Sequence, residues 1–205
     1  MAGVQERHAV RESPPSRYVS TPLPSGNRQY TAEELLAFPS DLHFELIEGN
    51  LRPLMMPTGD THGSCTALLT AFLVIPVAQH NLGSVFAAET GFLLQENPDV
   101  VKSPDFAFVA KLRTLPFTGK HAKVTPDPVL ETRSPSDRKA EIERKIAEWL
   151  SFGTKYVLDM NPAKETLTVY RRGAATFTLA RADTFTAEDI LPGFNLPLYK
   201  VFLVI

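Results

Sequence analysis

A strand, a helix and a second strand follow one another between residues 128 and 159, and this pattern constrains the fold most. Residues 128–133 read Pro-Val-Leu-Glu-Thr-Arg, which is typical of a strand in an apolar setting. The Ser-Pro-Ser-Asp run at 134–137 predicts a helix start, and the helix is expected over 135–152. Residues 155–159 predict the next strand. Because strands joined by a helix pair in parallel, we expect a sheet with this helix packed on it.

The rest of the chain predicts two more helices and several strands. A capping-box pattern at Thr31-Ala-Glu-Glu predicts a short helix. A long helix is expected over 62–81, kinked or ended near Pro76. Residues 44–56 predict a hairpin that turns at Gly49-Asn50. The other expected strands lie at 84–88, 91–95, 105–110, 166–171 and 176–181.

These elements predict one α/β (α+β) domain, a mixed β-sheet flanked by helices, over residues 29–205. Residues 1–28 are rich in Ser, Pro and Arg and are expected to form a disordered leader. The only cysteine, Cys65, cannot form an internal disulfide and is expected to be a small core residue.

Charge and hydropathy limit the partners. No stretch reaches the roughly 18 uninterrupted apolar residues of a membrane span, and charged residues at 7–17 exclude a signal peptide. We therefore expect a cytoplasmic protein with no membrane partner. The net charge of −2 argues against a protein that coats nucleic acid, but not against an enzyme whose acidic site binds metal ions.

Two acidic residues, Asp105 and Glu131, stand in otherwise apolar strands. Each alone could pair with an arginine or cap a loop, because a buried carboxylate needs a partner. Two of them on separate strands are better explained by a shared cation. Oxygen ligands suit Mg²⁺ or Mn²⁺, so we predict a metal pair whose carboxylate oxygens lie within about 5 Å of each other.

Two cations are candidates for the same site. Strand alternation puts Arg133 on the face of Glu131, so its guanidinium is expected to point into the cleft. Lys145 lies at the edge of the apolar helix stripe that includes Trp149, and its stem could carry the ammonium to the sheet. A surface pair between Lys145 and Glu141 is the alternative, and the sequence leaves both open.

Several motifs follow in order along the chain. They are Thr31-Ala-Glu-Glu-Leu-Leu, Phe44-Glu-Leu-Ile-Glu-Gly-Asn-Leu, Met56-Pro-Thr with His62, Ser103-Pro-Asp-Phe-Ala-Phe-Val, Pro126-Asp-Pro-Val-Leu-Glu-Thr-Arg-Ser-Pro-Ser-Asp, Glu143-Arg-Lys-Ile-Ala-Glu-Trp-Leu, Lys155-Tyr-Val-Leu-Asp-Met-Asn-Pro, Leu167-Thr-Val-Tyr-Arg and Leu191-Pro-Gly-Phe. Over roughly residues 30–203 the chain thereby resembles the Uma2 family, a bacterial group of predicted restriction endonucleases with the PD-(D/E)XK fold.

This resemblance implies a restriction-endonuclease-like core and Mg²⁺-dependent (or Mn²⁺-dependent) hydrolysis of DNA phosphodiesters. It places Glu45, Asp105 and Glu131 at the family's acidic positions and Lys145 at its helix-borne lysine. The carbonyl of Thr132 is expected to join the metal ligands, with Glu45 acting through water. Without the resemblance, Glu45 reads as a solvent-facing strand residue.

His62 matches a histidine that opens the long helix, and local hydrogen bonding at the helix start is the simpler interpretation. Arg133 departs from the family, in which this slot is apolar, so either Arg133 or Lys145 could be the catalytic cation. We expect Lys145 to orient the attacking water and Arg133 to offset charge in the transition state. The Ser134-Pro135 helix start is expected to offer N–H groups to a phosphate.

The sequence thus predicts an endodeoxyribonuclease with DNA as its partner. A homodimer is an option, since nucleases that cut both strands often act in pairs. A catalytically weak or inactive module for binding or assembly is the first alternative. A glycosidase-like use of the two carboxylates is another, but the only tryptophan lies on the core-facing helix stripe and offers no sugar platform.

Overall fold

The structure is a computed structural model that describes residues 28–39, 42–54 and 58–203. All of the predicted leader except Arg28 lies outside the described residues. The helices and strands are α1 (Ala32–Leu36), β1 (Phe44–Ile47), β2 (Asn50–Pro53), α2 (Asp60–His80), β3 (Gly83–Ala87), β4 (Phe92–Gln95), β5 (Val100–Lys102), β6 (Phe106–Ala110), β7 (Pro128–Thr132), α3 (Lys139–Ser151), β8 (Tyr156–Asn161), β9 (Thr166–Arg171), β10 (Phe177–Ala180), β11 (Thr184–Thr186) and β12 (Asn195–Pro197).

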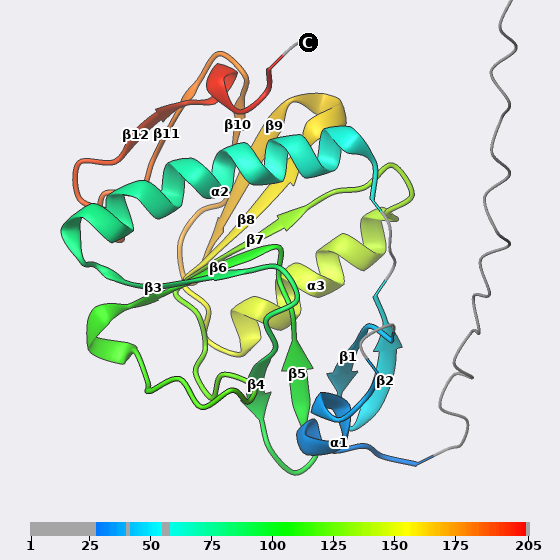
Figure 1. Cartoon of the computed structure of the whole chain (residues 1–205). Helices are drawn as coiled ribbons and strands as arrows, with labels where there is room; N and C mark the ends of the chain where they lie inside the picture. The colour runs from blue at the N-terminus through cyan, green and yellow to red at the C-terminus, as the bar shows by residue number, and fades with distance from the viewer. Residues whose placement is uncertain (1–27, 40–41, 55–57, 204–205) are drawn as a thin grey trace, which may run out of the picture.

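A mixed sheet forms the centre of the molecule, as predicted. Within the described residues it has six strands in the order β10-β9-β8-β7-β6-β3, of which β7 and β8 are parallel and the other neighbours antiparallel. Helix α2 lies across one face of this sheet and α3 across the other (Figure 1). The predicted strand–helix–strand unit is β7-α3-β8, and its crossover by a helix is what makes the parallel pair.

Strand alternation in β7 divides its side chains between the two helices. Leu130 belongs to the core cluster that includes Leu69 and Leu73 of α2. Val129 belongs to the cluster that includes Trp149 of α3. Glu131 therefore faces the side of the sheet on which α3 packs, because successive strand side chains point to opposite faces.

A second, smaller sheet lies alongside α3 (Figure 1), and Arg52 of β2 and Lys102 of β5 contact Glu148 of that helix. In the described part of the chain its order is β2-β1-β5-β4, with antiparallel neighbours. The hairpin β1-β2 was expected, whereas the short strand β5 was not. Because β5 runs almost directly into β6, this sheet brings Glu45 of β1 and Lys102 of β5 close to the start of β6.

The predicted start of α3 is wrong. The helix begins at Lys139, and residues 134–137 form a turn before it. Asp137 Oδ2 accepts the Ser134 N–H at 2.7 Å, and the Asp137 N–H donates to the Ser134 carbonyl at 3.1 Å. A short acidic side chain that satisfies nearby backbone groups competes with helix formation, so the capping residues here make a turn instead.

The long helix does not end near Pro76, which was one of the two predicted outcomes, since α2 extends to His80. A proline inside a helix removes one hydrogen bond, at a cost of about 3 kcal/mol. Leu73 and Val77, on either side of it, are buried against the sheet, and this packing outweighs the loss. Cys65 is buried in the same cluster, as expected.

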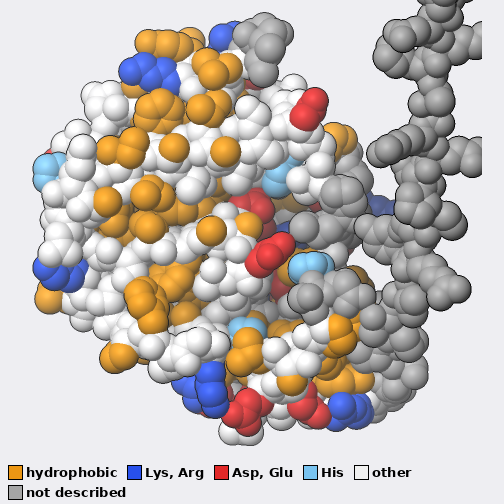
Figure 2. All heavy atoms as spheres, viewed as in Figure 1, with side chains coloured by type: hydrophobic (Ala, Val, Ile, Leu, Met, Phe, Trp, Pro, Cys, Tyr) orange, Lys and Arg blue, Asp and Glu red, His pale blue; other side chains and the backbone are white. Residues whose placement is uncertain are grey.

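The exposed side of α2 is apolar as well. Hydrophobic side chains gather along this helix in Figure 2. By length and composition alone α2 could cross a membrane, which is weak evidence because core helices of globular domains meet the same criterion. In this structure α2 packs on the sheet through its buried residues Cys65, Leu69, Leu73 and Val77.

Candidate functional site

Asp105 and Glu131 lie close together where β6 begins beside β7. The antiparallel register pairs Phe106 with Leu130 and Ala107 with Val129. Asp105 directly precedes β6, and its N–H donates at 3.0 Å to the carbonyl of Leu130, the residue before Glu131. The two acidic residues singled out in the sequence are therefore brought together.

The carboxylate of Asp105 is held at the end of β7. Its Oδ2 accepts the Thr132 N–H at 2.7 Å and lies 3.7 Å from His62 Nε2. Burial, together with the negative charge of Glu131, raises the pKa of Asp105. The structure thus holds two like charges close together in a partly buried place, which is unfavourable without a cation.

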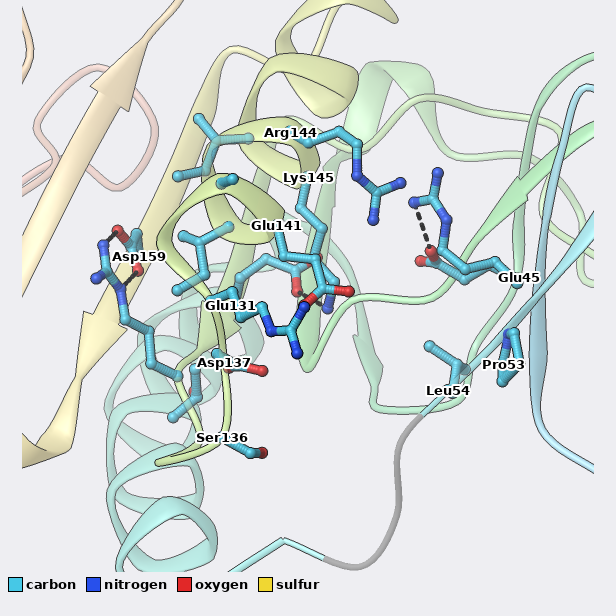
Figure 3. Close-up of a pocket in the computed structure, with 17 residues that line it drawn as sticks. Glu45, Pro53, Leu54, Glu131, Ser136, Asp137, Glu141, Arg144, Lys145 and Asp159 are labelled. Atoms are coloured by element: carbon cyan, nitrogen blue, oxygen red, sulfur yellow. Dashed lines mark hydrogen bonds and ion pairs between the residues drawn. The ribbon is translucent and has the colours of Figure 1, made fainter.

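Glu131 receives one partner on each oxygen, and both partners come from α3. Trp149 Nε1 donates to Oε1 at 2.7 Å, and Lys145 Nζ lies 3.4 Å from Oε2. The charge of Glu131 is the main cause of a raised pKa of Lys145. Figure 3 shows Lys145 extending from α3 to Glu131. Of the two interpretations of Lys145, the pair with Glu131 is the one observed.

Glu45 is buried rather than solvent-facing, with 1% of its side chain exposed. Its Oε1 accepts the Ser103 N–H at 3.2 Å. Among the described residues its Oε2 has no hydrogen-bond partner, and it lies 3.5 Å from the Arg52 guanidinium. Burial raises the pKa of Glu45 despite the nearby Lys102. The strands β1 and β2 are too short for their sequence pattern to show which face is buried. Only the packed structure therefore reveals that the Glu45 side chain points inward.

Arg133 lies on the predicted face but is already paired. Its Nε donates to Asp159 Oδ1 at 2.7 Å, and its second guanidinium nitrogen bonds the other oxygen. The parallel register places Asp159 beside Glu131, and Arg133, Asp159 and Glu131 line the same cavity. The side chain of Asp159 is only 1% exposed, so Arg133 neutralises a buried charge while also lining the cavity described below.

His62 reaches across to β7 instead of bonding within its own helix. Its Nε2 lies 3.1 Å from the Thr132 carbonyl, a bond that requires the proton on Nε2 because a carbonyl only accepts. Thr66, one turn later, donates its hydroxyl to that of Thr132 at 2.8 Å. The interpretation of His62 as a locally bonded residue is wrong, and α2 is tied to the end of β7 at Thr132.

A buried ionic cluster beside the site was not predicted. Lys102 is fully buried, and its ammonium bonds Glu148 of α3. Arg52 of β2 donates to both oxygens of Glu148, at 3.0 and 2.9 Å. Burial opposes ionisation of Glu148, but the bonds from Arg52 and Lys102 outweigh it and lower the pKa to about 2. The one available signal was a lysine within the apolar run Val100-Val-Lys.

A cavity of about 800 Å³ lies between α3 and the β1-β2 hairpin (Figure 3). Glu131 and Lys145 line it on one side and Glu45 on the other. Asp105 is not among its lining residues and joins the site through its proximity to Glu131. The remaining cationic side chains of the wall are Arg52, Arg133, Arg138 and Arg144.

The donor set fits a hard divalent cation. Among the described residues, no group of three or more His, Cys, Asp or Glu side chains could hold a metal ion, so Glu45 does not complete such a group. Asp105 and Glu131 remain, with the Thr132 carbonyl as a third oxygen. Mg²⁺ is commonly bound by one or two carboxylates and completes its shell with water and substrate phosphate.

Comparison with known proteins gives a family and a fold. The model of the Uma2 family, described as "Putative restriction endonuclease", matches residues 32–199. The crystal structure of "a putative nuclease belonging to DUF820" from Anabaena variabilis is similar, with a TM-score of 0.71 and 20% identity over 84% of this chain and 97% of that one. This likeness confirms the predicted restriction-endonuclease-like mixed α/β fold. A DrdV–DNA complex solved by cryo-electron microscopy covers 68% of this chain and 96% of its own, with a TM-score of 0.30 and 11% identity. No curated protein matches the chain.

Proposed function

The chain belongs to the Uma2 family, and from that premise we propose that it is a divalent-metal-dependent nuclease that hydrolyses DNA phosphodiester bonds. The observation that carries the proposal is the proximity of Asp105 to Glu131, with Lys145 on Glu131. A fold gains nothing in stability from holding two carboxylates together, and burial, together with the charge of Glu131, raises the pKa of Asp105. A site that binds a cation explains why the pair is there.

Asp105, Glu131 and the Thr132 carbonyl are the groups that would hold Mg²⁺ or Mn²⁺. Such an ion, when bound, lowers the pKa of a coordinated water and polarises a phosphate oxygen. The Thr132 N–H bond to Asp105 fixes one of these carboxylates. Trp149 and Lys145 fix the other. The chain thus supplies two carboxylates whose orientation is fixed by hydrogen bonds.

Lys145 is the cation that we assign to the attacking water. Its pKa is raised by Glu131, so it stays protonated at neutral pH and acts as a hydrogen-bond donor, not as a base. Its side chain is 34% exposed, so a water molecule and a phosphate can reach it. Arg133 is the weaker candidate, because two of its donors are committed to Asp159.

The substrate phosphates would be met by the cationic wall of the cavity. Arg138, the residue before α3, is exposed and forms no ion pair with any described residue. It is therefore free to contact a phosphate next to the scissile one. A wall with both acidic and basic side chains suits a polyanion that binds together with a metal ion, in keeping with a net charge of only −2.

Cleavage of plasmid DNA by the full chain tests the proposal, in Mg²⁺ or Mn²⁺ and in EDTA. We expect cutting that depends on the metal and disappears in Glu131→Gln. Lys145→Ala should slow cutting about 100-fold or more, the usual effect of losing one donor that stabilises a transition state. The matched control is Lys139→Ala on the same helix, where the side chain is 85% exposed and should not affect cutting.

Isothermal titration with Mn²⁺ separates the alternatives. Metal binding by the wild-type chain that is lost in Glu131→Gln, without DNA cleavage in either metal, would identify an inactive module of the same fold. If the wild-type chain neither binds Mn²⁺ nor cleaves DNA, the proposed function is refuted.

A further inference from the structure

Trp149 is a fully buried residue whose one polar atom is committed to the site. Its ring packs with Val129 and Val157 in the core between α3 and the sheet. Its Nε1–H donates to Glu131 Oε1 at 2.7 Å. A hydrogen bond to an ionised carboxylate is about twice as strong as a neutral one, so this contact is more than packing.

The spacing of Lys145 and Trp149 explains how Glu131 is oriented. The two residues are four apart, so they lie on the same face of α3 one turn from each other. Trp149 takes the oxygen on the core side, and Lys145 meets the other oxygen at the cavity. Rotation of the carboxylate would break the indole bond, so Oε2 is kept toward the cavity, where a ligand can reach it.

A buried cation holds the indole in place from its other side. The Lys102 ammonium lies 5.1 Å from the centre of the Trp149 ring and bonds Glu148, the preceding residue of α3. A cation near the face of an indole attracts the ring and withdraws electron density from it. This withdrawal makes the N–H a better donor to Glu131. The ionic cluster beside the site thereby also supports the contact between Trp149 and Glu131.

We propose that Trp149 is a positioning residue that holds Glu131 with one oxygen presented to the metal ion. This inference rests on the proposed function, but the contact itself can be tested without metal. The proposal also distinguishes Trp149 from an ordinary core tryptophan, whose N–H could be removed without affecting the site. Loss of an outer partner of a metal ligand typically lowers metal affinity about 10- to 100-fold.

The first experiment reads the contact in the metal-free protein. The chain has a single tryptophan, so its indole N–H gives one signal in a ¹⁵N–¹H NMR spectrum. Glu131→Gln removes the negative charge from the acceptor and should move this signal upfield. Val157→Ala, in the same core cluster but without contact to Glu131, should move it much less. Equal shifts in the two variants would overturn the proposal.

The second experiment measures Mn²⁺ affinity of the full chain by calorimetry. Trp149→Phe should bind Mn²⁺ about 10-fold more weakly or worse, whereas Val157→Ala should bind it like the wild type. Unchanged affinity in Trp149→Phe would overturn the proposal. Should Trp149→Phe fail to fold, biosynthetic replacement of the single tryptophan by benzothienylalanine keeps the ring shape and removes only the N–H donor.

The outcomes also separate the two proposals. If the wild-type chain binds no Mn²⁺, the proposed function fails, and the indole signal alone then decides whether Trp149 holds Glu131. If the wild type binds Mn²⁺ and cleaves DNA, and the tryptophan variants bind Mn²⁺ equally well, the function stands and the positioning role is refuted.

Discussion

Replacing Asp105 with Asn should stabilise the metal-free protein. Asp105 lies near Glu131 where β6 begins beside β7, and burial together with the charge of Glu131 raises its pKa. Asparagine removes the charge but keeps an oxygen that can accept the Thr132 N–H. The substitution therefore relieves repulsion at little cost in hydrogen bonding. An active site that sacrifices stability for function behaves in this way.

The size of the effect follows from the spacing of the strands. Neighbouring side chains on paired strands start about 5 Å apart. Two unit charges at about 5 Å repel by roughly 3 kcal/mol at an effective dielectric constant of about 20 and by roughly 1 kcal/mol in water. The side chains are 26% and 13% exposed, and Lys145 attracts both carboxylates. We therefore expect a gain of about 1–2 kcal/mol, or about 3–6 °C in Tm for a domain of this size.

The assay is thermal or urea unfolding in EDTA, repeated with Mg²⁺. Saturating metal should reverse the order, since an ion at 100 times its Kd stabilises the wild type by about 2.7 kcal/mol and the variant far less. The difference in the free energy of unfolding between the variant and the wild type in EDTA should also depend on pH. A raised pKa means that proton binding by Asp105 favours the folded wild type at low pH, and that this benefit is lost as the pH rises through the folded-state pKa. The difference in the free energy of unfolding between Asp105→Asn and the wild type should therefore be absent below pH 3.8, the usual pKa of aspartate, and should appear above it.

Asp159→Asn is the matched control, because it makes the same chemical change on the next strand. Asp159 is paired with Arg133, so its loss should destabilise the protein by about 1–3 kcal/mol. If Asp105→Asn destabilises the metal-free protein as Asp159→Asn does, the repulsion between Asp105 and Glu131 is not significant and the reasoning fails.

Two further substitutions test the charges around the site. Glu45→Gln should raise the free energy of unfolding at pH 8, because burial raises the pKa of Glu45 and the folded state therefore disfavours its ionised form. The gain should shrink as the pH falls toward the usual 4.5, and a gain that grows at low pH in urea unfolding would contradict this account. Arg133→Leu should lower the Tm, because a buried Asp159 loses its partner. Unchanged Tm values in this variant would show that Asp159 is satisfied without Arg133.

The central elements could be predicted because each has a local signal. The strand β7 is an apolar run, and α3 has an apolar stripe that its periodicity reveals. Asp105 and Glu131 stood out because they break the apolar pattern of their strands, and such local conflicts concentrate at functional sites. The start of α3 was missed because Ser, Pro and Asp serve equally well in a turn and in a helix cap.

Sequence alone therefore determined the sheet, its main helices and the presence of two conspicuous carboxylates. Tertiary structure decided which side chains meet them. The Lys102–Glu148 pair joins residues 46 apart, His62 and Thr132 are 70 apart, and Arg52 is 96 residues from Glu148. Periodicity gives the face on which a side chain lies but not which distant element packs on that face. Whether Glu45 is buried, whether Arg133 is already paired and whether Trp149 bonds Glu131 depend on that packing, because charge and hydrogen bonding act over a few ångströms of space and not along the chain.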